Sequence, residues 1–149
     1  MEDELLNVEL WRAITIAFLS GTVIGLERQY RGKPAGVRTA TLISIGTMLF
    51  VYMGSHIEGD SVDGGRVLGQ VVTGIGFIGA GVMFNHKGVV NGVTTAAVVW
   101  ILAAIGSMAG LGYLYMPLII TLLTVTVLST CTLLEKNFSF LRRGDYGEK

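Results

Sequence analysis

Hydrophobic residues form five long runs along the chain, separated by short polar segments. Each run is close to the roughly 20 residues that a helix needs to cross a bilayer. Backbone N–H and C=O groups cannot bond to lipid, so a helix is the structure that satisfies them within a run. The pattern predicts an all-α membrane bundle of about five transmembrane helices, in a single transmembrane domain. The runs cover about residues 10–26, 39–55, 67–84, 93–111 and 115–134 of the domain 1–149.

The third run differs from the others because it is rich in glycine, which weakens helix propensity. Two structures suit such a run: a closely packed helix, with the glycines as its packing face, or a broken helix that lines a cavity. Four of its glycines, Gly74, Gly76, Gly79 and Gly81, lie within eight residues. Between the fourth and fifth runs, Gly110–Tyr113 predicts a tight hairpin, and Pro117 then suits the first turn of the last helix.

Composition supports a membrane location. The chain is 51% hydrophobic and 15% charged, with a mean hydropathy of +0.61, whereas soluble domains carry roughly 25% charged residues. The formal net charge is zero, so no overall field favours nucleic acid, and we expect none as a partner. The first residues are acidic, unlike the basic start of a cleavable signal peptide, so we expect the first run to be retained as an anchor.

Lysine and arginine positions predict the orientation, because these residues concentrate in cytoplasmic loops. One side of the membrane receives nine of them and the other side two. We therefore expect the N-terminus outside and a short cytoplasmic tail, 135–149, at the C-terminus of a multi-pass protein. The nine are Arg28, Arg31, Lys33, Arg38, Lys87, Lys136, Arg142, Arg143 and Lys149, against Arg12 and Arg66.

The strongest local feature is the charged segment between the first two runs, which holds Glu27, Arg28 and Arg38 among its charges. One interpretation is a topology signal that also contacts anionic lipid, at about 1 kcal/mol per surface cation. The other is an organised site in which Glu27 orients an arginine, whose planar fork suits bidentate recognition. The sequence leaves both open.

Four motifs in this chain resemble the signature of the MgtC/SapB family of bacterial inner-membrane proteins. They are Gly25-Leu26-Glu27-Arg28, Ala35-Gly36-Val37-Arg38-Thr39, Gly74-Ile75-Gly76-Phe77-Ile78-Gly79-Ala80-Gly81-Val82 and Gly92-Val93-Thr94-Thr95-Ala96-Ala97-Val98-Val99-Trp100. The likeness covers about residues 10–130 in order and spacing. Together with the charged segment, it nominates a candidate functional cluster: Glu27, Arg28, Arg38, Thr39, Thr94 and Thr95.

The resemblance implies a plasma-membrane protein linked to magnesium limitation, to virulence in intracellular pathogens and to inhibition of the F-type ATP synthase. Many family members continue into a cytoplasmic domain. Only about 15 residues follow Leu134 here, so we expect the membrane domain alone. Some members carry asparagine where this chain has Thr94, and a hydroxyl is a smaller hydrogen-bonding group than an amide.

Candidate chemistry is sparse. There is no nucleophile–base arrangement, P-loop or zinc spacing, and the acidic segment from His56 to Asp63 lacks the ligand spacing of a calcium loop. We read that segment as a solvated loop, with a magnesium sensor as the alternative. We expect neither an enzyme, nor a cofactor, nor a metal site.

Ion-coupled transporters usually place ionisable residues within the membrane, whereas here Asp and Glu lie at run ends or between runs. The leading hypothesis is therefore a membrane regulator that contacts another membrane protein, with the ATP synthase membrane sector as the implied partner. A magnesium or other cation transport component is the alternative.

Glycine pairs at four-residue spacing occur in two of the runs, Gly21/Gly25 and Gly106/Gly110. Small residues at this spacing let two helices approach closely. They indicate either packing between helices of one chain or the seam of a homodimer.

Overall fold

The chain folds into five α-helices and one short β-hairpin in a computed structural model that describes residues 7–56, 64–86 and 89–137. The helices are α2 (Val8–Tyr30), α3 (Val37–Ser55), α4 (Gly64–Gly81), α5 (Val93–Gly110) and α6 (Met116–Asn137), and the strands are β1 (Phe84–His86) and β2 (Val89–Asn91). The prediction of an all-α bundle with about five helices is confirmed. The antiparallel hairpin, which pairs Phe84 with Asn91 and His86 with Val89, was not predicted.

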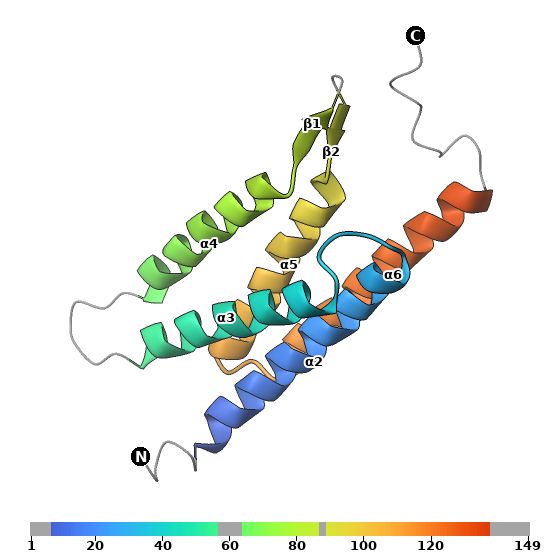
Figure 1. Ribbon diagram of the computed structural model, residues 1–149. Coiled ribbons are helices and arrows are strands. Elements are labelled where there is room, and N and C mark those ends of the chain that lie inside the picture. Colours follow the sequence, from blue (N-terminus) through green and yellow to red (C-terminus); the bar gives the residue numbers. More distant parts are fainter. Residues whose placement is uncertain (1–6, 57–63, 87–88, 138–149) are drawn as a thin grey trace.

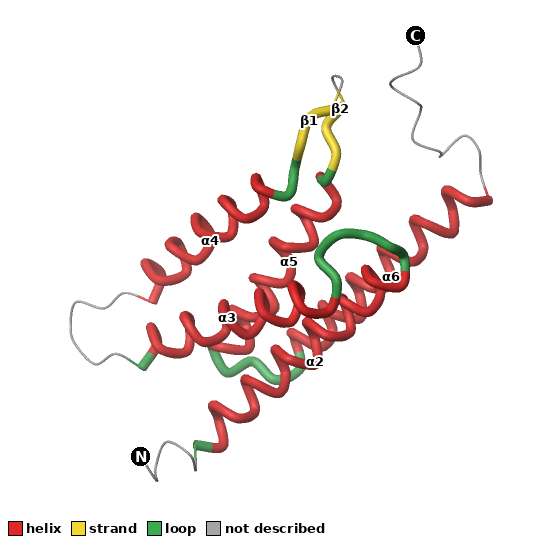
Figure 2. The backbone as a smooth tube through the Cα atoms, in the orientation of Figure 1, coloured by secondary structure: helices red, strands yellow, loops and turns green. Residues whose placement is uncertain are grey.

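The five helices run back and forth between two ends of the bundle (Figure 1). One end, here called the N-terminal end, holds the start of α2, the end of α3 and the turn between α5 and α6. The opposite end holds the end of α2, the start of α3, the β-hairpin and the start of α5. Figure 2 shows that the connections outside the helices gather at these two ends. The described connections are thus kept away from the middle of the bundle.

Four of the described helices are long and apolar enough to cross a membrane: α2, α3, α5 and α6 as far as Glu135. Their outward surfaces carry large apolar side chains, which lipid rather than water would solvate. The remaining helix, α4, has 18 residues, carries Arg66 and Gln70, and runs between the same two ends as the other four (Figure 1). The arrangement is that of a multi-pass membrane protein.

Two boundaries differ from the predicted ones. The charged segment was placed in a loop from Glu27 onward, but α2 continues to Tyr30, because charged residues with long side chains are good helix formers. Gly32 follows the C-cap residue Arg31, has a φ of +63° and donates its N–H to the Gln29 carbonyl, which closes the end of the helix. The third run was extended to Phe84, but α4 ends at Gly81 and Phe84 belongs to β1.

Glycines bring α2, α3 and α5 into close contact. A Cβ on Gly21 would lie 2.7 Å from the Cα of Thr41, and one on Gly25 would lie 2.6 Å from the Cα of Val37. On α5, a Cβ on Gly106 would collide with the Ser44 carbonyl oxygen of α3. The Gly21/Gly25 and Gly106/Gly110 pairs therefore serve packing within one chain, the first of the two interpretations.

The third helix is not the packing centre that its glycines predicted. A Cβ on Gly74, Gly76 or Gly81 would meet nothing within 4 Å, and one on Gly79 would reach only the Ala96 side chain at 3.9 Å. α4 is a continuous helix, so the broken-helix alternative is also wrong. Its glycines leave open surface because only its Ile75 face packs on α5, against Val99 and Ala103.

The predicted hairpin between the last two helices is confirmed. Gly112 has a φ of +87°, its N–H bonds to the Ala109 carbonyl, and the N–H of Tyr113 bonds to the Met108 carbonyl, at 3.0 Å each. This pair of bonds satisfies carbonyls that the end of α5 would otherwise leave open. Pro117 is buried in the first turn of α6, as predicted.

Candidate functional site

The last turn of α2 presents the charged residues of the site. The N–H of Lys33 bonds to the Arg28 carbonyl at 2.9 Å, and that of Gly32 to the Gln29 carbonyl at 3.0 Å. These two bonds close the helix with the glycine-dependent cap described above. The backbone then turns sharply, with Ala35 at a φ of +60°, and enters α3. Glu27 and Arg28 are therefore held on a fixed helical turn rather than on a loose loop.

Arg28 is buried, with 4% of its surface exposed. Its Nη2 donates a hydrogen bond of 2.8 Å to Oγ1 of Thr95, and its Nε donates one of 3.4 Å to the Pro34 carbonyl. Thr95, itself 3% exposed, lies in the first turn of α5. A single guanidinium thus ties together the end of α2, the connection to α3 and the start of α5, which are distant in the sequence.

Glu27 forms an ion pair with Arg31, one helical turn further along the chain. The side chain of Glu27 is only 8% exposed, and both of its carboxylate oxygens lack a hydrogen bond within the described part of the chain. The Glu27 carboxylate also interacts electrostatically with the guanidinium of Arg28, the next residue along the chain. The prediction that Glu27 engages an arginine is met by Arg31, which the candidate cluster did not include.

The start of α5 depends on a glycine. Gly92, which precedes the helix, has a φ of +88°, and a Cβ there would collide with the Val82 carbonyl oxygen that follows α4. Only glycine combines this conformation with this close approach. Gly92 therefore fixes where α5 begins, and with it the position of Thr95 three residues later.

Three members of the candidate cluster lie apart from the Arg28 contacts. Arg38, Thr39 and Thr94 are exposed, and within the described residues none of them has a side-chain hydrogen bond or ion pair. The structure therefore unites Glu27, Arg28 and Thr95, and adds Arg31 and Pro34. The sequence could have indicated Arg31, because it lies four residues after Glu27 and such a pair can form an ion pair on a helix. No sequence signal pointed to the Pro34 carbonyl.

A second feature lies between α3 and α4, where an apolar groove of about 680 Å³ opens along the bundle. Thr39 contributes to this groove rather than to the Arg28 contacts. Gly46 on α3 and Gly74 on α4 line it, and a Cβ at either position would meet nothing within 4 Å. Its remaining walls are mostly large apolar side chains: Leu42, Ile43, Phe50, Val67, Val71, Ile75 and Ile78, with Thr47 and Gln70.

The site and the groove contain no catalytic arrangement among the described residues, and no group of three His, Cys, Asp or Glu side chains there is placed to hold a metal ion. What the Arg28 contacts can do is hold three segments in one arrangement, since a buried guanidinium without its acceptors would be costly. The features together define a multi-pass helical membrane protein with an ordered charged end and a groove along its side.

Comparison with known proteins places this membrane protein in a family. The sequence profile of the MgtC family matches residues 14–137, and the chain belongs to that family. It is 40% identical over 132 residues to the protein MgtC of Brucella suis biovar 1 (strain 1330), a match that covers 87% of this chain and 55% of that protein. The chain thus spans about half the length of the MgtC protein it matches.

The chain is also similar to two proteins with other names. The chain is 40% identical over 129 residues to the protein SrpB of Synechococcus elongatus, covering 78% of this chain and 71% of SrpB. It is 37% identical over 137 residues to a protein of Escherichia coli K12 named "Putative magnesium transporter YhiD", covering 84% of this chain and 64% of YhiD. No solved structure matches the chain.

Proposed function

We propose that this chain is a non-enzymatic regulator of the bacterial inner membrane that acts by binding another membrane protein, the membrane sector of the F-type ATP synthase, when magnesium is scarce. The partner is the one implied by the MgtC/SapB resemblance. In pathogens that live inside host cells, the same regulation would support virulence. The N-terminus lies outside and the C-terminus in the cytoplasm, as the distribution of lysine and arginine predicts.

The observation that carries this proposal is the apolar groove between α3 and α4. Leu42, Phe50 and Ile78 line it and are exposed, and the open glycines on its two walls, Gly46 and Gly74, leave room for close approach. Transmembrane helices associate through surfaces of this kind, because small residues let backbones come near and increase van der Waals contact. The groove therefore suits a helix from a partner inside the bilayer.

The test is capture from native membranes with a groove variant and a matched control. Gly46→Leu fills the groove without displacing any neighbour, because a Cβ at that position meets open space. Gly69→Leu makes the same change on α4 at an equally open position outside the groove. We expect tagged wild-type protein and Gly69→Leu to retain synthase membrane-sector subunits, and Gly46→Leu to lose them.

Two results would count against the proposal. Equal capture by Gly46→Leu and wild type would show that the groove is not the docking surface. Capture of a second copy of this chain in place of synthase subunits, measured with two differently tagged forms, would show that the groove forms a homodimer instead.

Transport of magnesium or another cation is the second candidate, and the name of the YhiD relative favours it. Against it, the buried polar groups of the described helices away from the Arg28 end are neutral hydroxyls, such as Ser20, Ser44 and Thr47, whereas ion-coupled transporters usually need ionisable groups inside the membrane. Magnesium flux into liposomes that contain the purified protein would decide the matter. Flux above that of protein-free liposomes would favour transport over regulation.

A further inference from the structure

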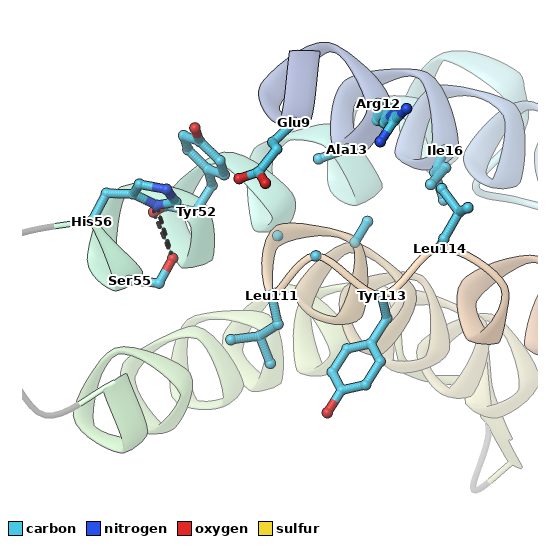
Figure 3. Close-up of a pocket in the computed structure, with 13 residues that line it drawn as sticks. Glu9, Arg12, Ala13, Ile16, Tyr52, Ser55, His56, Leu111, Tyr113 and Leu114 are labelled. Atoms are coloured by element: carbon cyan, nitrogen blue, oxygen red, sulfur yellow. Dashed lines mark hydrogen bonds between the residues drawn. The ribbon is translucent and has the colours of Figure 1, made fainter. Parts of the chain in front are cut away.

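A pocket of about 360 Å³ lies at the N-terminal end of the bundle, away from Arg28 and from the groove. Figure 3 shows its position between the first turns of α2, the end of α3 and the α5–α6 turn. Glu9 and Arg12 come from α2, Tyr52 and His56 from α3, and Tyr113 from the turn. Three segments that are distant in the sequence therefore build one pocket, whose mostly apolar walls also carry charged, polar and aromatic side chains.

The α3 wall of the pocket is ordered by its own contacts. The ring of Tyr52 stacks on that of His56, with centroids 4.1 Å apart, and Nδ1 of His56 lies 2.8 Å from the Tyr52 carbonyl. The Tyr52 hydroxyl accepts a hydrogen bond of 2.7 Å from Nδ2 of Asn7, the residue that caps α2. Tyr52 is thus fixed at both its ring and its hydroxyl, and the pocket does not depend on a mobile aromatic side chain.

The charges around the pocket suit a ligand that carries both signs. The carboxylate of Glu9 extends toward Tyr52, while Arg12 lies one turn further along α2 (Figure 3). Neither side chain has an ion-pair partner among residues 7–56, 64–86 and 89–137. The C-terminal ends of α3 and α5 also meet the pocket, and such ends favour a positive charge. A cationic group is therefore expected beside Glu9, and an anionic group beside Arg12.

Exposed aromatic residues place the pocket at the level of the lipid headgroups. Trp11 on α2, Tyr113 in the turn and Tyr115 before α6 all lie at this end of the bundle, and each is more than half exposed. Tryptophan and tyrosine gather at membrane–water interfaces, where one part of the ring system is in lipid and the polar atom is hydrated. A headgroup is thus the zwitterion that reaches this pocket at the highest local concentration.

We propose that this pocket binds a phosphoethanolamine group, with its primary ammonium on the Glu9 carboxylate and its phosphate on the Arg12 guanidinium. Phosphatidylethanolamine in the surrounding bilayer is the source. An ammonium with N–H donors fits a carboxylate and helix carbonyl ends, whereas the trimethylammonium of phosphatidylcholine has no donor to offer them. The proposal is independent of the partner proposed above, because none of the residues that line this pocket lines the groove between α3 and α4.

The experiment measures lipid binding to the full-length protein in detergent by native mass spectrometry. Phosphatidylethanolamine, phosphatidylcholine and phosphatidylglycerol with identical acyl chains are titrated separately. We expect phosphatidylethanolamine to bind about tenfold more tightly than phosphatidylcholine, the change that follows from losing one charge-assisted hydrogen bond. Glu9→Gln should remove that preference, and Arg12→Gln should weaken all three lipids.

Matched controls keep the outcome specific. Glu135→Gln and Arg66→Gln remove the same charges at exposed positions outside the pocket, and both should retain wild-type lipid selectivity. Soluble glycerophosphoethanolamine is then added as a competitor of phosphatidylethanolamine. If it binds with the same affinity as the lipid, the headgroup chemistry is supported, and the acyl chains are not needed for binding. Equal binding of phosphatidylethanolamine and phosphatidylcholine, or a preference that Glu9→Gln leaves unchanged, would overturn the proposal.

Discussion

The guanidinium of Arg28 donates a hydrogen bond of 2.8 Å to the hydroxyl of Thr95, which lies 67 residues further along the chain. The two side chains are almost fully buried, whereas Lys33 and Arg38 at the same end of the bundle are exposed. This bond links the last turn of α2 to the first turn of α5. A topology signal alone requires no such contact, and the first two predictions test whether the identity of these residues matters.

The first prediction compares two neighbouring threonines. Thr95→Val keeps the side-chain shape but leaves the Arg28 guanidinium without its hydroxyl acceptor, so we expect a loss of about 1–3 kcal/mol in the free energy of unfolding. Thr94→Val makes the same change at an exposed residue and should have almost no effect. Thermal unfolding of both variants in the same detergent measures the difference. Equal stability of the two would show that the Arg28–Thr95 bond contributes nothing.

The second prediction separates charge from identity in the basic segment. Glu27→Gln removes the partner of Arg31 and leaves two guanidinium groups beside a neutral amide, so we expect reduced complementation of growth under magnesium limitation. Arg38→Lys should be silent, because Arg38 is exposed and has no side-chain partner within the described residues. Complementation is scored at equal membrane abundance. Full activity of Glu27→Gln would leave only the topology interpretation.

The number of helices could be predicted from the sequence, whereas the contacts between them could not. Hydrophobic run length and the glycine turn at Gly112 are local signals. Local sequence does not show which of Thr94 and Thr95 faces the inside of the bundle. Neighbouring residues on a helix point about 100° apart, and a helix that is apolar all round has no polar face to mark its outer side. The contact of Arg28 with Pro34 depends on a backbone path that the sequence does not reveal.

The third prediction concerns the glycines, since those of the pair Gly106/Gly110 pack closely within the chain and those of α4 do not. We expect Gly106→Leu to lower the thermal stability and the yield of folded protein, because its side chain would collide with the Ser44 carbonyl of α3. Overpacking costs roughly 1–3 kcal/mol and occasionally more. Gly76→Leu is the control, since a Cβ there meets nothing within 4 Å. Comparable yields of both variants would mean that α3 and α5 do not pack closely through Gly106.

The last prediction tests whether α4 crosses the membrane. Hydropathy and length select α2, α3, α5 and α6 as spans, and four spans would place both termini on the same side. In the fold, however, α4 runs between the same two ends as its neighbours (Figure 1), which gives five crossings and termini on opposite sides. The two arrangements differ in one observable: whether the residues that flank α4 are on the same face.

Single cysteines in a Cys131→Ser background provide that observable, through labelling by a membrane-impermeant reagent in intact and opened cells. The positions are Lys33 in the connection after α2, His56 after α3 and Phe84 after α4. We expect His56→Cys to be labelled from outside, and Lys33→Cys and Phe84→Cys only after the cells are opened, because positive charge is retained in the cytoplasm. Labelling of His56→Cys and Phe84→Cys from the same face would show that α4 lies on the membrane surface, and that the groove beside it is not enclosed by lipid.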